Sequence, residues 1–333
     1  MKDIAQDLGL SVVTVSKVLR DHPDISEETR QRVLIRVKEL DYQPNVLARS
    51  LVTGRSFLVG LVVPGLLHPF FAEIAKALST VIRAKGYSLI VSSSEEDPEL
   101  ERQGIRQLLA RRLDALVIAS SGTSIELFQG MDRQSQPYVL IDREFPELKA
   151  NFVGIDDITA GRIATEHLLD IGCHCVAHIG GRENSTSIRR FEGYRQALHN
   201  RDVPFSEEYV VRGMHVDTES IQQGTEAMRL LLQRNPRPDG VFCHSDALAM
   251  GAMNTILDAG LKIPEDIAII GCGNLHYNDC LRVGLSSIDQ HSEQIGECAA
   301  EIILGLIETK VVPAVRTVIL EPALIVRAST KRT

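Results

Sequence analysis

The sequence predicts a small all-α head with a helix-turn-helix, followed by an α/β body of two doubly wound parallel-sheet subdomains. Three observations lead to this fold class. Residues 1–43 hold short apolar stripes at helical spacing, separated by turn residues. From Phe57 onward, short apolar runs alternate with longer amphipathic segments. The chain has 333 residues, enough for about two or three domains.

The predicted head contains three short helices. Gly9 ends the first, Ser11 can cap the second, and Ser26 can cap the third. Their apolar stripes are, in chain order, Ile4, Ala5 and Leu8; Val15, Val18 and Leu19; and Val33, Leu34, Val37 and Leu40. Two helices joined by a tight turn and followed by a third form a helix-turn-helix pattern. Residues 44–56 follow as a further short helix and linker.

The body shows two series of alternating strands and helices. Strands are expected at 57–63, 88–93, 115–120 and 138–142, then in a second series at 152–156, 175–181, 209–211, 240–243 and 267–272. Helices are expected between them at 69–85, 98–111, 188–200 and 219–233. A further helix is expected to end at 170, and another to begin at 246. This alternation implies parallel sheets, which bind ligands at the carboxyl ends of their strands. We therefore expect a small-molecule site in the cleft between the two subdomains.

Composition narrows the class of protein. The net charge of −8 argues against non-specific binding to nucleic acid, although residues 1–56 hold nine Lys or Arg against eight Asp or Glu. No apolar run approaches the roughly 20 residues of a membrane span, and the N-terminus lacks a signal core. Six cysteines show no compact framework. We therefore expect a cytoplasmic protein that does not enter a membrane.

Two sets of motifs identify a resemblance. The stretch "KDIAQDLGLSVVTVSKVLRDHPDISEETRQRVLIRVKELDYQPNVLARSL" closely resembles the DNA-binding head of the LacI/GalR family of bacterial repressors. The motifs "HPFFAEI", "YVLIDRE", "HIGG", "RRFEGYRQAL", "SDALAMGA", "IPEDIAIIGC" and "SSIDQ" resemble the effector domain of that family and periplasmic sugar-binding proteins. The resemblance covers essentially the whole chain. It implies subdomains of periplasmic-binding-protein type, at 57–155 with 290–320 and at 156–289 with 321–333.

The resemblance places the second helix of the head in the major groove of DNA. It implies that Val12, Val13 and Lys17 read bases, and that Thr14 and Ser16 contact phosphate, with Ser11 at the start of the helix. Branched apolar side chains suit thymine methyl groups, and Lys17 suits guanine O6 and N7. The alternative is that Val12 and Val13 close the small core of the head.

The segment "PNVLARSL" resembles the hinge helix of the family, which enters the minor groove. There Leu51 would wedge between base steps and kink the DNA, with Asn45 and Arg49 close to the backbone. The alternative is an ordinary flexible linker.

The resemblance also implies an effector pocket in the body. Its expected residues are His68, Phe70, Phe71, Asp142, Arg143, Arg190, His215, Ser245, Asp246, Gly273 and Gln290. The alternatives are that Asp142 and Arg143 form a surface ion pair and that the two phenylalanines belong to the core. Many relatives carry an aspartate where this chain has Gly273. Arg143 and Arg190 then face one carboxylate fewer, which favours a sugar acid or sugar phosphate, whereas a bulkier neutral sugar is the alternative.

The sequence therefore predicts a DNA-binding transcriptional regulator, a repressor that forms a homodimer on a pseudo-palindromic operator and responds to a small effector. A solute-binding protein of a sugar transporter is the alternative function. We expect neither an enzyme nor a cofactor, because no nucleophile elbow, P-loop or dinucleotide fingerprint is present. We also expect no metal site, because Cys173 and Cys175 lack structural-zinc spacing. The first helix has no capping residue before Lys2, so we expect the native chain to begin a few residues upstream.

Overall fold

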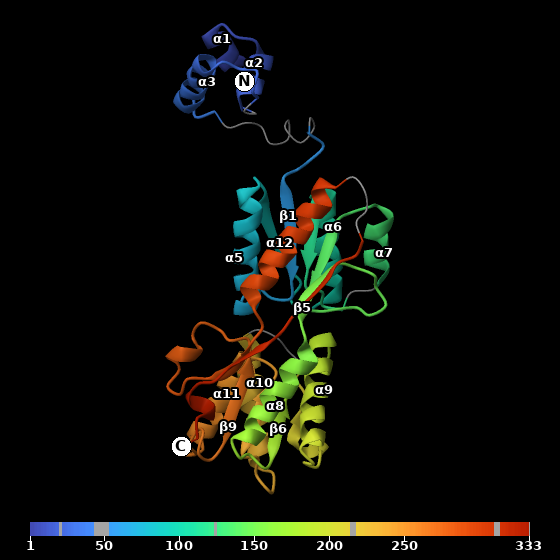
Figure 1. Cartoon of the computed structure of the whole chain (residues 1–333), viewed down its shortest axis with the longest axis vertical. Helices are drawn as coiled ribbons and strands as arrows, with labels where there is room; N and C mark the ends of the chain where they lie inside the picture. The colour runs from blue at the N-terminus through green and yellow to red at the C-terminus, as the bar shows by residue number, and fades with distance from the viewer. Residues whose placement is uncertain (20–21, 43–52, 123–124, 214–217, 310–313, 333) are drawn as a thin grey trace. The chain divides into compact units, whose positions relative to one another are not determined.

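The structure is a computed structural model of the chain, and it describes residues 1–19, 22–42, 53–122, 125–213, 218–309 and 314–332. It divides into two compact units, Met1–Ser56 and Phe57–Thr333, each described here by itself (Figure 1). We call the first unit the head and the second the body. Within the described part of the chain, none of the helices has both the length and the apolar character that a membrane span requires.

The head contains the three predicted helices, α1 (Lys2–Leu8), α2 (Val12–Leu19) and α3 (Glu27–Glu39). Gly9 ends α1 in the left-handed conformation, with φ of 66°, which glycine adopts without steric cost. Ser11 Oγ accepts a hydrogen bond from Thr14 N at 3.0 Å, and Ser26 Oγ accepts one from Thr29 N at 3.4 Å. Both predicted caps are therefore confirmed.

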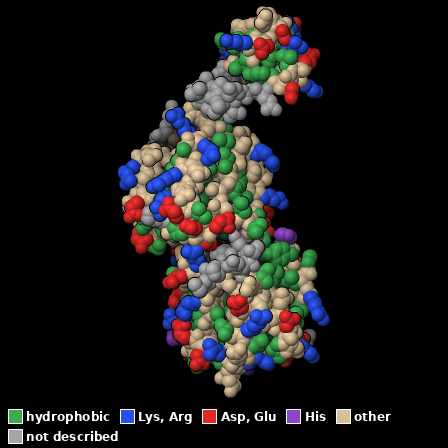
Figure 2. Space-filling view, turned by 180° about the vertical axis from the view of Figure 1, so that it is seen from behind, with side chains coloured by type: hydrophobic (Ala, Val, Ile, Leu, Met, Phe, Trp, Pro, Cys, Tyr) green, Lys and Arg blue, Asp and Glu red, His purple; other side chains and the backbone are tan. Residues whose placement is uncertain are grey.

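The core of the head is smaller than the sequence predicted. Ile4, Ala5, Val15, Val18 and Val33 are buried, and Val37 packs against them. Leu34 and Leu40, which were expected on the buried side of α3, are exposed by 43% and 42%. Leu34 is turned about 100° from Val33 around the helix, and Leu40 lies beyond the last helical residue. Figure 2 shows hydrophobic side chains at the surface of the head.

Two six-stranded sheets form the body. The first has the order β11-β5-β4-β3-β1-β2 and is parallel throughout. The second has the order β12-β10-β9-β8-β6-β7, and its pairs are parallel except β10–β12. The strands are β1 (Leu58–Val63), β2 (Ser88–Ser93), β3 (Ala115–Ile118), β4 (Tyr138–Ile141), β5 (Phe152–Ile155), β6 (Val176–Ile179), β7 (Val210–Val211), β8 (Gly240–Cys243), β9 (Ala268–Cys272), β10 (Ser286–Asp289), β11 (Thr317–Leu320) and β12 (Ala323–Ile325).

Helices cover both faces of each sheet, as a doubly wound fold requires. On the first sheet, α5 and α12 pack on one face and α6 and α7 on the other; on the second, α8 and α9 oppose α10 and α11 (Figure 1). The helices are α5 (Pro69–Ala84), α6 (Pro98–Ala110), α7 (Ile125–Arg133), α8 (Asp157–Asp170), α9 (Ser185–Asn200), α10 (Thr218–Leu232), α11 (Asp246–Asp258) and α12 (Ser292–Glu308). The predicted fold class is confirmed.

One strand was assigned to the wrong series. The periodicity of the sequence placed 152–156 at the start of the second series, but β5 pairs with β4 and β11 in the first sheet. The subdomain bounds that the family resemblance implied, 57–155 with 290–320, already include both β5 and β11. The chain passes from the first sheet to the second after β5, returns after β10 to form α12 and β11, and crosses again to β12. Periodicity along the chain cannot show this, because it carries no information about which strands pair.

Candidate functional site: a cleft between the two sheets and an exposed helix face on the head

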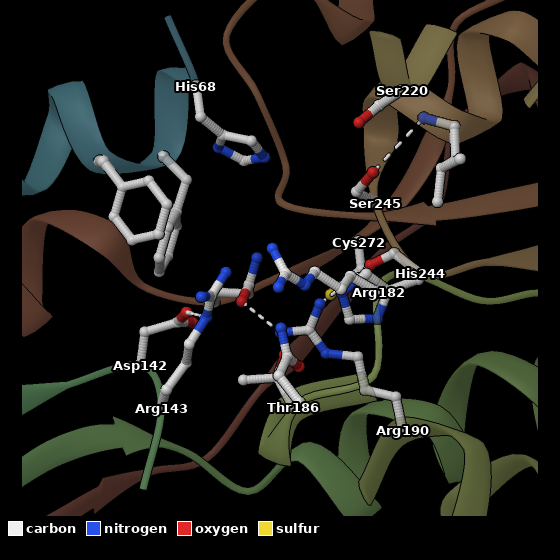
Figure 3. A pocket seen from close by; sticks show the side chains of 16 residues that line it. His68, Asp142, Arg143, Arg182, Thr186, Arg190, Ser220, His244, Ser245 and Cys272 are labelled. Atoms are coloured by element: carbon white, nitrogen blue, oxygen red, sulfur yellow. Dashed lines mark hydrogen bonds and ion pairs between the residues drawn. The ribbon is translucent and has the colours of Figure 1, made fainter. Parts of the chain in front are cut away.

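A cleft lies where the carboxyl ends of strands from both sheets meet (Figure 3). From the first sheet it is lined by the loop and helix start after β1 and by the two residues after β4. From the second sheet it is lined by the loops after β6, β8 and β10 and by the end of β9. Its residues are His68, Phe70, Phe71, Asp142, Arg143, Gly181, Arg182, Asn184, Thr186, Arg190, Ser220, His244, Ser245, Leu248, Cys272 and Gln290. This is the place that parallel sheets provide for a ligand.

Arg190 of α9 is held by three acceptors at one end of the cleft. Its Nε donates to Asp157 Oδ1 at 2.7 Å, its Nη1 to the carbonyl oxygen of His244 at 2.9 Å, and its Nη2 to Gln290 Oε1 at 2.6 Å. Arg190 and Asp157 are both buried. Burial raises the pKa of Asp157 to about 6, and the charge of Arg190 opposes that rise. The guanidinium is therefore fixed in orientation but its carboxylate partner titrates near neutrality.

Arg143 and Arg182 both contact Glu96, in the loop after β2. Arg143 donates to the two carboxylate oxygens of Glu96 at 2.5 and 3.0 Å and to the carbonyl oxygen of Ser120 at 3.0 Å. Arg182, from the second sheet, donates to the carbonyl oxygen of Glu96 at 2.6 Å. The carboxylate of Asp142 lies 3.7 Å from Arg143 Nε. Asp142 and Arg143 thus line the cleft and do not form a surface ion pair.

Two imidazoles face the cleft in the neutral state. The Nδ1 atoms of His68 and His244 are buried, and neither has a hydrogen-bond partner among the described residues. Burial, with the nearby charges of Arg143 and Arg190, lowers the pKa of His68 to about 4. Burial and Arg190 lower the pKa of His244 well below its ordinary value. Each ring therefore offers one donor and one acceptor near neutral pH.

Phe70 and Phe71 form an aromatic wall at the start of α5. Their ring centroids lie 5.1 Å apart at 70°, and the His68 ring lies 5.5 Å from that of Phe71. Both phenylalanines line the cleft and also belong to the core of the body. The two phenylalanines are therefore both core residues and a wall of the cleft, so the two alternatives stated for them do not exclude each other.

Two expected residues do not reach the cleft. Asp246 is fully buried and accepts hydrogen bonds from Ser287 Oγ at 2.6 Å, Asn278 Nδ2 at 2.8 Å and Leu275 N at 3.0 Å. Gly273, with φ of 140°, lines a separate surface cavity. Neither residue therefore lines the cleft, contrary to expectation. The Asp246 carboxylate instead connects segments of the second subdomain by hydrogen bonds, and Gly273 allows the chain to turn beside it. His215 lies outside the described residues.

Sequence reasoning missed several residues of the site. The unpredicted cleft residues with polar side chains are Arg182, Asn184, Thr186, Ser220, His244 and Cys272. Two acidic partners of cleft arginines were also missed: Glu96, which binds Arg143 and Arg182, and Asp157, which binds Arg190. His244 directly follows β8 and Cys272 ends β9, so the strand-end rule alone was sufficient to find them. Glu96 and Asp157 act through arginines, and no spacing in the sequence connects them.

On the head, the start of α2 presents its side chains to solvent. Val12 and Val13 are exposed by 41% and 64%, so the alternative that they close the core is wrong. Lys17 Nζ lies 3.4 Å from a carboxylate oxygen of Asp24. Ser11 Oγ and Thr14 Oγ1 are hydrogen-bonded at 2.9 Å, and Ser16 is half-buried on the same helix. The three hinge residues, Asn45, Arg49 and Leu51, lie outside the described residues.

A helix-turn-helix head followed by a two-sheet body with a cleft is the architecture of a ligand-responsive DNA-binding regulator. Comparison with known proteins gives the family. Residues 1–45 match the model of bacterial regulatory proteins of the lacI family, and residues 56–322 match the model of periplasmic binding proteins and the sugar-binding domain of the LacI family. The chain belongs to the LacI family and is a DNA-binding transcriptional regulator.

Individual relatives agree with this assignment over nearly their full length. The chain is 31% identical to the ribose operon repressor of Halalkalibacterium halodurans over 99% of this chain and 97% of that one. It is 33% identical to the transcriptional repressor PurR of Pectobacterium carotovorum, over 93% and 91%. A solved LacI-family regulator from Silicibacter pomeroyi superposes with a TM-score of 0.82 at 28% identity, covering 99% of both chains. The regulator CelR in complex with cellobiose gives 0.75 at 28% identity, covering 98% of both.

Proposed function

We propose that the cleft binds a small sugar-like effector, and that its binding changes the affinity of the head for operator DNA. The observation that supports this most strongly is a pair of buried Nδ1 atoms for which the described residues supply no hydrogen-bond partner. His68 comes from the first sheet and His244 from the second, and both face the same cleft. Buried polar atoms ordinarily have partners, so a ligand with hydroxyl groups is the natural source of them. A ligand that contacts both sides biases their arrangement.

The charges in the cleft favour a neutral effector. An anion was expected because Arg143 and Arg190 seemed to outnumber their acids. Each of them has a carboxylate partner, Glu96 for Arg143 and Asp157 for Arg190. With Asp142 beside Arg143 and Arg182 at the rim, three carboxylates face three guanidinium groups. A neutral sugar keeps this balance, whereas an anion disturbs it.

A sugar acid or sugar phosphate is the second candidate. Arg182 is the observation that favours it, since its side chain is 36% exposed and its Nη1 lies 3.6 Å from the carboxylate of Glu96. An anionic group at the rim of the cleft would pair with this guanidinium. The names of two relatives, a ribose operon repressor and a CelR–cellobiose complex, accord with the neutral candidate.

Calorimetric titration with neutral sugars, sugar acids and sugar phosphates tests both candidates. We expect a neutral mono- or disaccharide to bind and to change operator affinity in a parallel gel-shift assay. Tight binding of acids or phosphates alone would select the second candidate. Specific operator binding that no member of any of the three groups alters would contradict the proposed function.

We further propose that the protein is a homodimer in the bacterial cytoplasm, without catalytic turnover. Two heads of a dimer would match a pseudo-palindromic operator, and the hinge at 44–56, with Leu51 as a wedge, would transmit rearrangement of the body. In this scheme residues 57–155 with 290–320 move against 156–289 with 321–333. Sedimentation that shows a monomer or a stable tetramer at micromolar concentration would overturn the dimer.

A further inference from the structure

A second cavity lies beside the cleft, between α9 and the edge strand β7, next to the end of β6. Its volume is about 290 Å³, against about 60 Å³ of free space in the cleft. The residues that matter here are His178, Gly180, Ile188, Phe191, Val210 and Arg212. The second cavity therefore has more room for a small molecule than the cleft as it stands.

The loop after β6 separates the two spaces. Gly181 lines both of them. Arg182, and Thr186 further along, line the cleft, whereas Glu183 and Ser187 line the second cavity. Residues of this loop and of the first turn of α9 therefore face the cleft on one side and the second cavity on the other. The second cavity is thus distinct from the effector cleft.

His178 lines this cavity, and one of its ring nitrogens is an unused hydrogen-bond acceptor. It is 1% exposed, and its Nδ1 lies 3.1 Å from the carbonyl oxygen of Phe242. A carbonyl oxygen only accepts, so Nδ1 carries the proton. Nε2 is then the acceptor, and it is buried without a partner among the described residues. Burial lowers the pKa of His178 to about 4, which keeps the ring neutral near pH 7.

The remaining walls suit a neutral ring. Phe191 contributes an aromatic side chain, and Ile188 and Val210 contribute aliphatic ones. The guanidinium of Arg212 lies 5.3 Å from the centroid of the Phe191 ring and pairs with Glu207 at 3.2 Å. Because Arg212 already has a carboxylate partner, the described lining of the cavity offers no unpaired cation to an anionic ligand.

We propose that this cavity is a second small-molecule site, which takes a neutral ring bearing a hydrogen-bond donor. The donor, an O–H or a ring N–H, bonds to His178 Nε2, and the ring packs against Phe191, Ile188 and Val210. A hydroxylated ring and an aromatic ring share this chemistry. This inference goes beyond the proposed function, since it concerns a space on the other side of the loop.

The proposal is tested by nitrogen NMR of the full-length protein with ¹⁵N-labelled histidine, titrated with phenol, myo-inositol and indazole. Phenol and indazole are aromatic donors, whereas myo-inositol is a hydroxylated ring without aromatic character. Anisole has the shape of phenol but no donor, so it is the matched probe. We expect at least one donor probe to shift the His178 Nε2 resonance, and anisole to leave it unchanged.

Gly180→Ala is the matched variant. An added Cβ at Gly180 would lie 3.5 Å from His178 Nε2 and 3.6 Å from the carbonyl oxygen of Val211, both ordinary contacts. We therefore expect the methyl group to cover the acceptor without disturbing the fold, and an unchanged melting temperature in thermal unfolding is the check. We expect the affinity of the binding probe to fall about tenfold or more, because its donor loses its partner.

Ile188→Trp fills the same cavity from the exposed start of α9 and is a second, independent block. The proposal is overturned if none of the three donor probes shifts Nε2 up to about 50 mM. It is also overturned if anisole acts like phenol, or if both variants bind the probe as the wild type does. Effector binding in the cleft plays no part in these readouts, so failure of the proposed function leaves them unchanged.

Discussion

Arg182 donates a hydrogen bond across the cleft to the main-chain carbonyl oxygen of Glu96, at 2.6 Å. The same glutamate binds Arg143 through its carboxylate, so one residue joins the loops that follow β2, β4 and β6. Glu95 and Glu96 have φ of 47° and 59°, in the left-handed region that costs energy for residues other than glycine. A strained loop is retained here because the contacts of Glu96 hold it.

Glu96→Gln should weaken this connection. The substitution keeps the size of the side chain and the main-chain bond to Arg182, but it leaves Arg143 with only the more distant carboxylate of Asp142, at 3.7 Å. Loss of one partner of a buried ion pair costs about 3–5 kcal/mol, and we expect a fall in the free energy of unfolding towards the lower end of that range. Urea denaturation measures it.

Glu95→Gln is the matched control for this change. Glu95 lies in the same strained loop and is exposed, and its side chain accepts a hydrogen bond from Ser93 Oγ. We expect its substitution to change stability by less than about 1 kcal/mol. Equal losses for the two variants would mean that the loop conformation matters and the pairing with Arg143 does not.

Effector affinity should depend on pH through Asp157. Its pKa of about 6 means that the carboxyl is ionised above that pH and pairs with Arg190, and is neutral below it. The pKa of His68, about 4, lies too low to contribute, and burial raises the pKa of Asp142 from its ordinary value. We expect affinity to fall as pH decreases from about 8 to about 5, because Arg190 loses its charged anchor.

The same shift affects stability with the opposite sign. The folded state binds the Asp157 proton more tightly than the unfolded state, so this group's contribution to stability is lost as pH rises from about 4 to about 6. Asp157→Asn should flatten the pH profile of effector affinity, measured by calorimetry. Asp156→Asn is the control, since asparagine also caps a helix and the pKa of Asp156 is lowered. A profile that Asp157→Asn leaves unchanged would place the titration elsewhere.

The sequence was sufficient for elements whose signal is local. Apolar runs and caps located β1, α5 and α6 to within one residue or so, because those signals lie inside each element. Periodicity placed β5 in the wrong series, because pairing is a property of distant strands. The subdomain bounds 57–155 with 290–320, which include β5, came from the family resemblance and not from local patterns. Leu34 was wrongly expected to be buried because an amphipathic stripe has an edge that periodicity does not locate.

The candidate site was likewise predicted from the sequence only in part. Asp142, Arg143 and Arg190 were predicted from motifs, and the structure brings them to the cleft. Asp246 has the motif but its carboxylate faces the interior, because Ser287, Asn278 and Leu275 supply donors there. The expected excess of positive charge in the cleft was also wrong, since Glu96 pairs with Arg143 from 47 residues away in the chain. Contacts at such separation are outside the reach of local patterns.

Gly273→Asp should destabilise the protein and should not create a carboxylate in the cleft. A Cβ at this position would lie 3.0 Å from Asp246 Oδ2, and φ of 140° is unfavourable for any residue with a side chain. We expect a lower melting temperature in thermal denaturation, and no specific gain in affinity for a neutral sugar. Gly273→Ala separates the two causes, because it carries the backbone strain without the charge. A stable aspartate variant with altered effector preference would show that the loop adopts another conformation.

Base reading by the head should depend on α2 side chains that contribute little to its stability. Val13 is 64% exposed, so Val13→Ala should change the melting temperature only slightly while it weakens operator binding through the loss of a contact to a thymine methyl group. Val15 lies on the same helix and is fully buried, so Val15→Ala is the matched control, with a loss of about 1–2 kcal/mol in stability. Gel shifts on duplexes selected from a random library give affinity, and calorimetric unfolding gives stability. A Val13→Ala variant that binds the selected duplex as tightly as the wild type would remove Val13 from the reading face.

Lys17→Ala completes the test of that face. Its ammonium group lies 3.4 Å from the carboxylate of Asp24, with both side chains exposed, so the ion pair contributes little to stability. On the operator, a bidentate contact to guanine would be worth about 1–3 kcal/mol and would be confined to one base pair. We therefore expect weaker binding together with relaxed preference at a single position in each half-site. Asp24→Asn releases the ammonium group from its partner and removes a negative charge, so it should strengthen binding to every duplex and leave the preference unchanged. Uniform weakening by Lys17→Ala across all duplexes, with a smaller salt dependence, would assign Lys17 to a phosphate instead of a base.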